Sequence, residues 1–261
     1  MRPGRAETTP AAAPDETVKL TIGRAAGLVG ALALVIAWGS GAGALPDVGL
    51  WPDVLIVVLV LFPLTFSVVW LALPLRELRG LFLIAIALGA LAWAFSEAGM
   101  DNAFNAAKLA AYMLVGFWFM ELFEVLWSIA VVAAIIPIVD AFSVWRGPTK
   151  VVIEQQPGIF DQISIAFRIS GEDATSKIGP PDILFFALFL AAAQRFRLRV
   201  AATFFSMLAL LGITVAITAP ANRGLPALPA VALGFLIPNA DRLWQEIRAA
   251  RGDRTHAPRR R

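Results

Sequence analysis

Two aspartates, Asp140 and Asp182, stand inside strongly apolar stretches, where an ionisable side chain is costly in a membrane. Asp140 lies near the end of SIAVVAAIIPIVDAFSVWRG, about one helical turn before the last apolar residue. Asp182 opens the next long apolar run, KIGPPDILFFALFLAAA. If these runs are consecutive antiparallel spans, both carboxyl groups approach the same membrane face at similar depth. Such a pair can share one proton, so that one member activates water while the other protonates a carbonyl oxygen.

The residue types that are missing narrow this chemistry further. The chain has no cysteine, and its one histidine, His256, lies in the polar C-terminal tail. These counts argue against a thiol nucleophile, a disulfide and a histidine-based metal site or triad, so we expect no metal and no cofactor. Carboxylates inside spans also mark ion and proton pathways, and the residues alone leave transport open beside peptide hydrolysis.

The elements that must position these acids are membrane helices. Hydrophobic residues make up 59% of the 261-residue chain and charged residues 16%, with a mean hydropathy of +0.74, which is too apolar for a soluble domain. The sequence predicts an all-α polytopic membrane protein with about eight transmembrane helices. We place them at 22–44, 53–74, 79–97, 104–121, 124–145, 180–195, 199–219 and 224–244. Only ELFE separates the fourth from the fifth, so one long tilted helix is the alternative there.

Four regions follow from this division. Residues 1–20, rich in Pro, Ala and Thr, predict a disordered leader. We expect an N-terminal helical bundle over 21–122, a region carrying both acids over 123–245, and a basic tail over 246–261.

Basic residues near the span ends predict the orientation in the cell membrane. The arginine-rich tail and the bare loops at 45–52 and 98–103 place both termini in the cytoplasm. The basic loop at 146–178 is the contrary signal, because this orientation puts it outside. The net charge is +3, and the arginines that carry it lie at span ends and in the tail. We therefore expect the lipid bilayer, and no nucleic acid, as partner. Lys108, one turn inside the fourth span, is expected to snorkel to the interface.

The loop between the two acids predicts a short β-hairpin. Apolar and polar residues alternate from Ile163 to Ile169, after a Pro-Gly pair at 157–158 that is typical of a turn. An exposed strand edge in this loop could hold an extended peptide, although a hairpin that only covers the membrane face fits the pattern equally well.

Three short motifs in the second half of the chain carry a family resemblance. PIVDAFSVWRGPTKVVIE contains an acid late in a span, IGPPD places the second acid after glycine and proline, and GLPALPAVALGFL contains Pro-Ala-Leu. Together they resemble the presenilin and signal-peptide-peptidase family of intramembrane aspartyl proteases, a presenilin-like helical bundle with a Gly-x-Gly-Asp motif. The motifs occur in the family's order, with one span between the second and third. The resemblance covers about residues 125–240, and the earlier spans match only in hydrophobicity.

The resemblance implies an enzyme that hydrolyses peptide bonds within transmembrane segments. It makes Asp140 and Asp182 the catalytic pair. With both termini in the cytoplasm, the implied substrates are signal-peptide remnants or type II anchors. The other implied site residues, which contact the substrate and position the acids, are Gly179, Pro181, Pro226, Ala227 and Leu228.

Two positions depart from the family pattern. Val139 stands where the family usually has tyrosine, which removes a hydroxyl from beside the pair. Pro181 replaces the second glycine, fixes φ near about −65° and deletes an N–H. Because proline is well tolerated just inside a helix start, we expect the fold to be kept and the substrate edge to change. An inactive presenilin-like binding protein and an ion or proton transporter are the alternative functions.

Overall fold

Helices dominate the computed structural model, which describes residues 21–147, 151, 155–170, 175–221 and 226–255. The helices of the first half are α1 (Ile22–Gly41), α2 (Leu50–Ile56), α3 (Phe62–Leu71), α4 (Leu81–Glu97), α5 (Asp101–Glu121) and α6 (Leu126–Arg146). Those of the second half are α8 (Pro157–Ile163), α9 (Pro180–Arg195), α10 (Val200–Thr218) and α11 (Leu228–Thr255). A π-helical segment, Val57–Leu61, joins α2 to α3. The all-α polytopic class is confirmed.

Five of the described segments are long and apolar enough to cross a membrane: Ile22–Ala44, Leu50–Glu77, Asp101–Glu121, Leu126–Arg146 and Val200–Thr218. Helix α4 is apolar but shorter. The predicted count of eight spans is therefore not confirmed. Helix α9 has 16 residues and begins with two prolines, and α11 carries charged residues in its second half. Neither helix shows the uninterrupted apolar length that marks a span on its own.

The break at ELFE separates two helices. Helix α5 ends at Glu121 and α6 begins at Leu126, so the alternative of one long tilted helix is wrong. At the other end of the chain, α11 continues to Thr255, so the first residues of the expected tail are helical. The predicted leader and His256 lie outside the described residues.

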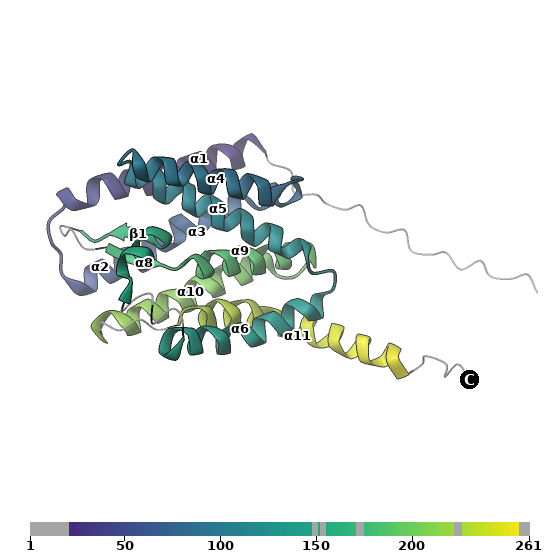
Figure 1. Ribbon diagram of the computed structural model, residues 1–261. Helices are drawn as coiled ribbons and strands as arrows, with labels where there is room; N and C mark the ends of the chain where they lie inside the picture. The colour runs from purple at the N-terminus through teal and green to yellow at the C-terminus, as the bar shows by residue number, and fades with distance from the viewer. Residues whose placement is uncertain (1–20, 148–150, 152–154, 171–174, 222–225, 256–261) are drawn as a thin grey trace, which may run out of the picture.

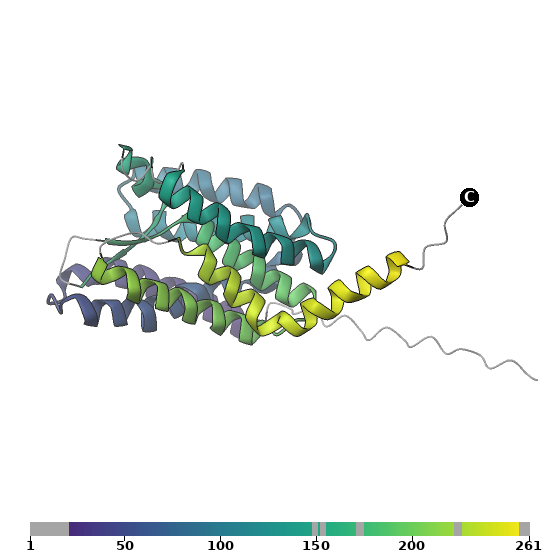
Figure 2. The same cartoon turned by 90° about the horizontal axis from the view of Figure 1, so that it is seen from below.

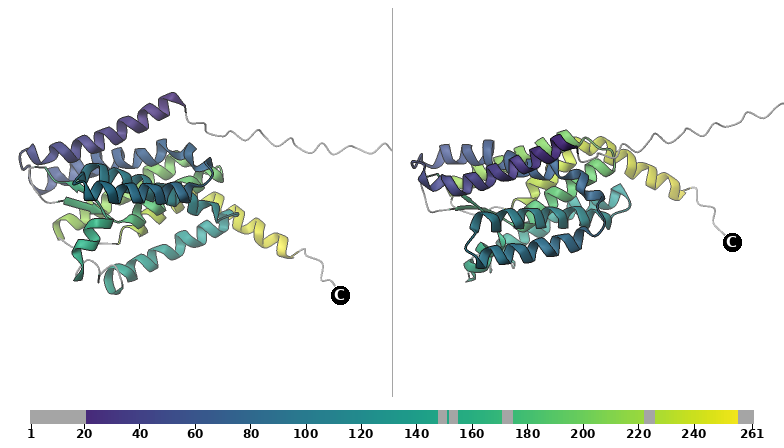
Figure 3. Two further views of the ribbon diagram at one scale, coloured as in Figure 1. Left: turned by 45° about the horizontal axis from the view of Figure 1, so that its top comes forward. Right: turned by 90° about the horizontal axis from the view of Figure 1, so that it is seen from above.

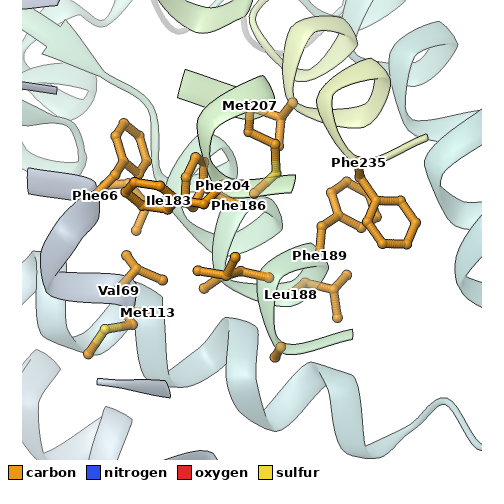
Figure 4. Close-up of a cluster of buried hydrophobic side chains, with 14 of the residues drawn as sticks. Phe66, Val69, Met113, Ile183, Phe186, Leu188, Phe189, Phe204, Met207 and Phe235 are labelled. Carbon is orange, nitrogen blue, oxygen red and sulfur yellow. The ribbon is translucent and has the colours of Figure 1, made fainter. Parts of the chain in front are cut away.

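Helix α9 lies at the centre of the bundle, between α3 and α5 on one side and α10 and α11 on the other (Figures 1 and 2). Every residue from Phe186 to Ala193 is fully buried. The Phe186 ring packs 4.2 Å from that of Phe66 on α3, and the Phe189 ring stacks 4.9 Å from that of Phe235 on α11 (Figure 4). The helix that carries Asp182 is therefore shielded from lipid by protein on its sides.

Two glycines let helices touch at the backbone. A Cβ atom added at Gly116 of α5 would lie 2.4 Å from the carbonyl oxygen of Leu184 on α9. A Cβ atom added at Gly234 of α11 would lie 2.5 Å from the Cα atom of Met207 on α10. Small residues at such crossings allow the close van der Waals packing that holds membrane helices together. The α5–α9 and α10–α11 pairs are thus fixed at close range.

The loop between α6 and α9 contains the predicted hairpin, with a different turn. Strands β1 (Ile165–Arg168) and β2 (Thr175–Ile178) pair antiparallel, with Ile165 opposite Ile178. The Pro-Gly pair does not form the turn, because Pro157 opens helix α8 instead. Proline is favoured at the first helical position, where its missing N–H is no loss. The strand that pairs with β1 follows it in the sequence instead of preceding it.

The sequence suggested that Lys108 snorkels to the interface, and this prediction is wrong. Its side chain is only 5% exposed, and its ammonium group donates to the carbonyl oxygens of Gln162 and Ser164. One turn further along α5, the Tyr112 hydroxyl donates to the Ile163 carbonyl at 2.7 Å. These carbonyls lie at the C-terminal end of α8, where helical carbonyls lack intrahelical donors. Helix α5 therefore holds the end of α8 and the start of β1, and the carbonyls replace water around the lysine.

Lys108→Met is expected to destabilise the protein by about 2 kcal/mol, because buried carbonyls lose a charged donor. Tyr112→Phe should cost about 1 kcal/mol for one neutral hydrogen bond. Denaturant unfolding of the purified protein in detergent measures both changes. The matched control is Lys177→Met, which removes a more exposed ion pair with Asp161 and should cost less than about 1 kcal/mol. Equal losses at Lys108 and Lys177 would contradict the role of the buried lysine.

Candidate active site

Three elements far apart in the chain meet at the site: the end of α6, the start of α9 and the start of α11 (Figures 1 and 3). Asp140 stands six residues before the end of α6 and is half-buried. Its Oδ2 atom accepts a hydrogen bond from the backbone N–H of Leu228, the first residue of α11, at 3.0 Å. The first acid is thereby joined directly to the Pro-Ala-Leu segment.

The second acid, Asp182, belongs to the first turn of α9. Its Oδ2 atom accepts a hydrogen bond from the Gly179 N–H at 3.2 Å, and its own N–H donates to the Gly179 carbonyl at 3.2 Å. This reciprocal pairing satisfies backbone groups at the helix start and fixes the carboxyl group there. A Cβ atom at Gly179 would come within 3.3 Å of the carboxyl oxygen, so glycine leaves room for the contact.

Pro180 and Pro181 occupy the first two positions of α9, where the absent N–H groups cost little. The Pro181 side chain is exposed beside Asp182. The helix therefore starts normally despite the departure from the Gly-x-Gly-Asp pattern.

The structure brings the two acids together. Asp140 and Asp182 lie close enough for the charge of one to act on the other, although 41 residues of sequence separate them. Each carboxyl group also holds one backbone N–H donor, from Leu228 and Gly179 respectively. A pair of this kind shares a proton readily, because both members cannot ionise together in a medium of low dielectric constant.

The Pro-Ala-Leu residues form the N-terminus of α11. The Ala227 carbonyl accepts from the N–H groups of Ala230 and Val231, which begins the helix, and the Leu228 side chain is buried. Pro226 and Ala227 are half-buried. One helix, α10, separates this segment from α9, as the motif order predicted. The hydrogen bond from Leu228 was not foreseen, because a backbone donor leaves no mark in the residue types.

An exposed apolar surface of α6 adjoins Asp140. The Val139 side chain, at the position where the resembled family usually has tyrosine, is 55% exposed. Ile135, Ile138 and Phe142 extend the same exposed surface along the helix. Strand β2 ends at Ile178, directly before Gly179 and the start of α9. Asp140 thus adjoins an exposed apolar helix surface, and Asp182 follows shortly after a strand in the sequence.

Among the described residues, no group of three or more His, Asp or Glu side chains is arranged to hold a metal ion. A comparison of the chain with protein-family models and with curated proteins finds no match to either.

Proposed function

We propose that the chain is an intramembrane aspartyl protease of the presenilin and signal-peptide-peptidase type, with Asp140 and Asp182 as the catalytic pair. The observation that carries this proposal is the hydrogen bond from the Leu228 N–H to Asp140, at a point where Asp182 is also close. Three motifs recognised separately along the sequence therefore converge on one pair of carboxyl groups. A transporter's acids require no such link to a Pro-Ala-Leu segment.

The chemistry needs one shared proton and a water molecule. The unprotonated carboxylate takes a proton from water as the water oxygen attacks the scissile carbonyl carbon, and the protonated carboxyl group gives its proton to the carbonyl oxygen. A tetrahedral diol results. The carboxyl group that received the water proton then protonates the leaving nitrogen, the C–N bond breaks, and the diol returns its proton to the other carboxylate. The pair ends with one proton, as it began.

A transmembrane peptide fits the surroundings of the pair. The exposed apolar residues of α6 offer a helical substrate a surface equivalent to lipid. Strand β2 ends four residues before Asp182, and β1 pairs with it on one side. An unwound substrate segment that adds to the other edge of β2 would present its peptide bonds next to the acid. Pro181 cannot donate a backbone hydrogen bond to such a segment, so the pairing has to end before it.

The direct test incubates the purified protein, in detergent and in liposomes, with a panel of single-span peptides of both orientations. Mass spectrometry of the products identifies any cleaved bond. Cleavage inside the apolar segment supports the proposal. Binding of the peptides without cleavage by the wild-type protein would contradict it and would assign the chain the role of a peptide-binding protein instead.

The proposed orientation is tested with two single cysteines in this cysteine-free chain. Gln156, before α8, and Glu246, on α11, have exposed side chains. Figure 1 shows α8 and the C-terminal part of α11 at opposite ends of the bundle. We expect an impermeant thiol reagent to label Gln156→Cys in cells with an intact membrane, and to label Glu246→Cys only after permeabilisation. This result would favour substrates with a cytoplasmic N-terminus, namely signal-peptide remnants or type II anchors. Labelling in the reverse order would overturn both the orientation and this preference.

A further inference from the structure

A second polar site lies away from the acids, between the C-terminal end of α1, the N-terminal end of α5 and strand β1. It is a cavity of about 630 Å³, which we term the α1–α5 cavity. Its polar lining comprises Ser40, Asp101, Asn102, Asn105, Lys108, Asp161 and Arg168. Neither Asp140 nor Asp182 lines it, so the cavity is distinct from the proposed catalytic pair.

The polar residues of α5 are costly where they stand. Asp101, Asn105 and Lys108 follow one another at intervals of four and three residues, which puts them on one face of the helix. The helix is one of the segments able to cross a membrane, and polar groups in such a segment are rare unless they face protein or a polar cavity. This face of α5 therefore turns its polar groups to the cavity instead of the lipid.

Hydrogen bonds between elements fix the walls of the cavity. The Asn102 amide donates to the Ser40 hydroxyl of α1 at 2.8 Å, and the Trp38 indole of α1 donates to the Arg168 carbonyl of β1 at 3.1 Å. The Asn105 side chain accepts from the Ala166 N–H of β1 at 3.4 Å. The cavity is thus a built feature that ties α1, α5 and the hairpin together.

Opposite charges stand on different walls of this cavity. Asp101 belongs to α5 and Arg168 to β1, whereas the ammonium of Lys108 is held by carbonyls and the Phe104 ring, and Asp161 pairs with Lys177. A small inner recess of about 20 Å³ adjoins the cavity and shares Asn102 and Asn105 with it.

Thr65 also lines the recess. Its side chain is fully buried, and its hydroxyl has no hydrogen-bond partner among the described residues. A buried hydroxyl without a partner is costly, so this polar group is available to a ligand or to water that enters with one.

The location of the cavity identifies the class of ligand. It lies where one membrane-crossing segment ends and another begins, which is the level of lipid headgroups, and α1 on its rim is largely unburied. Apolar residues Ile36, Met100 and Phe104 complete the lining. A ligand that enters here comes from the bilayer, with a polar head for the cavity and acyl chains for the exposed side of α1.

We propose that the α1–α5 cavity binds the headgroup of a zwitterionic phospholipid with a primary ammonium group, the phosphoethanolamine type. Its phosphate pairs with the Arg168 guanidinium and accepts from the amide of Asn102, and its ammonium group donates to the Asp101 carboxylate. Lys108 and Asp161 are held by other protein groups, and the two remaining charges of the cavity, on Asp101 and Arg168, match the two charges of this headgroup. A choline headgroup lacks the N–H donors, and a glycerol headgroup lacks the positive charge.

The test uses the purified full-length protein after removal of bound lipid. Native mass spectrometry measures the binding of phosphatidylethanolamine, phosphatidylcholine and phosphatidylglycerol that carry the same acyl chains. We expect phosphatidylethanolamine to bind at least about tenfold more tightly than the other two, since each lacks one charge-assisted interaction. Arg168→Gln should weaken all three lipids, and Asp101→Asn should weaken phosphatidylethanolamine to the level of phosphatidylcholine.

Matched controls separate specific binding from loss of fold. Glu121→Gln changes an acid at the opposite end of α5, Arg79→Gln changes an exposed arginine in the turn before α4, and both should bind as wild type. Arg168→Lys keeps the positive charge and should recover part of the affinity. Thermal unfolding in detergent checks that each variant is folded. Equal binding of the three lipids, or variants indistinguishable from the controls, would overturn the proposal and identify only non-specific annular lipid.

Discussion

Asp140→Asn and Asp182→Asn are each expected to abolish intramembrane cleavage, with a loss of about four orders of magnitude in turnover. The amide keeps the shape of the side chain and can still accept from the N–H of Leu228 or Gly179. It cannot share the proton that both steps of the reaction need. Quantitative mass spectrometry of peptide products measures the loss, and thermal unfolding should show little change.

Two comparisons make this result specific to the pair. Asp47→Asn, in the exposed turn after α1, keeps the short hydrogen bond to the Gly49 N–H and should cleave as wild type. The double variant at Asp140 and Asp182 should be no slower than either single variant, because residues that act as one unit have non-additive effects. Near wild-type proteolysis in either single variant would disprove the assignment.

Leu228→Pro should reduce turnover by about two orders of magnitude, through the backbone alone. The substitution deletes the N–H that donates to Asp140, and a charge-assisted hydrogen bond of about 1.5–3 kcal/mol is lost with it. Proline is favoured at the first position of a helix, which Leu228 occupies in α11, so the helix itself should persist.

Leu228→Ala is the matched control for this prediction. It keeps the N–H and truncates a buried side chain, so it should lower the free energy of unfolding by about 2–5 kcal/mol. Turnover of the folded protein should stay near wild type. If the alanine and proline variants lose turnover equally, the side chain and not the backbone donor supports the site. If both lose only stability, the segment serves the packing of α11 alone.

The helical class and the main elements could be predicted because the length of a hydrophobic run is a local property of the sequence. The break between α5 and α6 at residues 122–125 was placed correctly for this reason. Asp140 and Asp182 could be singled out because charge inside an apolar run is equally local.

The failures concern groups whose role depends on partners distant in sequence. Lys108 was expected to reach water, and the carbonyls that hold it come from residues more than fifty positions away. The Pro-Gly pair at 157–158 fits a turn as well as a helix start, and only the position of β2 decides between them. The α1–α5 cavity left a readable signal, the spacing of Asp101, Asn105 and Lys108, but its opposite wall comes from α1 and β1.

The way α6 is held predicts that the thickness of the bilayer controls the proposed proteolysis. Asp182 stands on α9, which the backbone contact at Gly116 fixes against α5, whereas Asp140 stands on α6, which lies at the edge of the bundle, packs mainly against α11 and buries few of its residues (Figure 3). A helix with so much exposed apolar surface changes its tilt to match the surrounding hydrocarbon. Tilting α6 moves one acid while the other stays in place. Turnover in liposomes should therefore pass through a maximum as the acyl chains are lengthened. The lipid would change the fraction of molecules in which the two acids are close enough to act together.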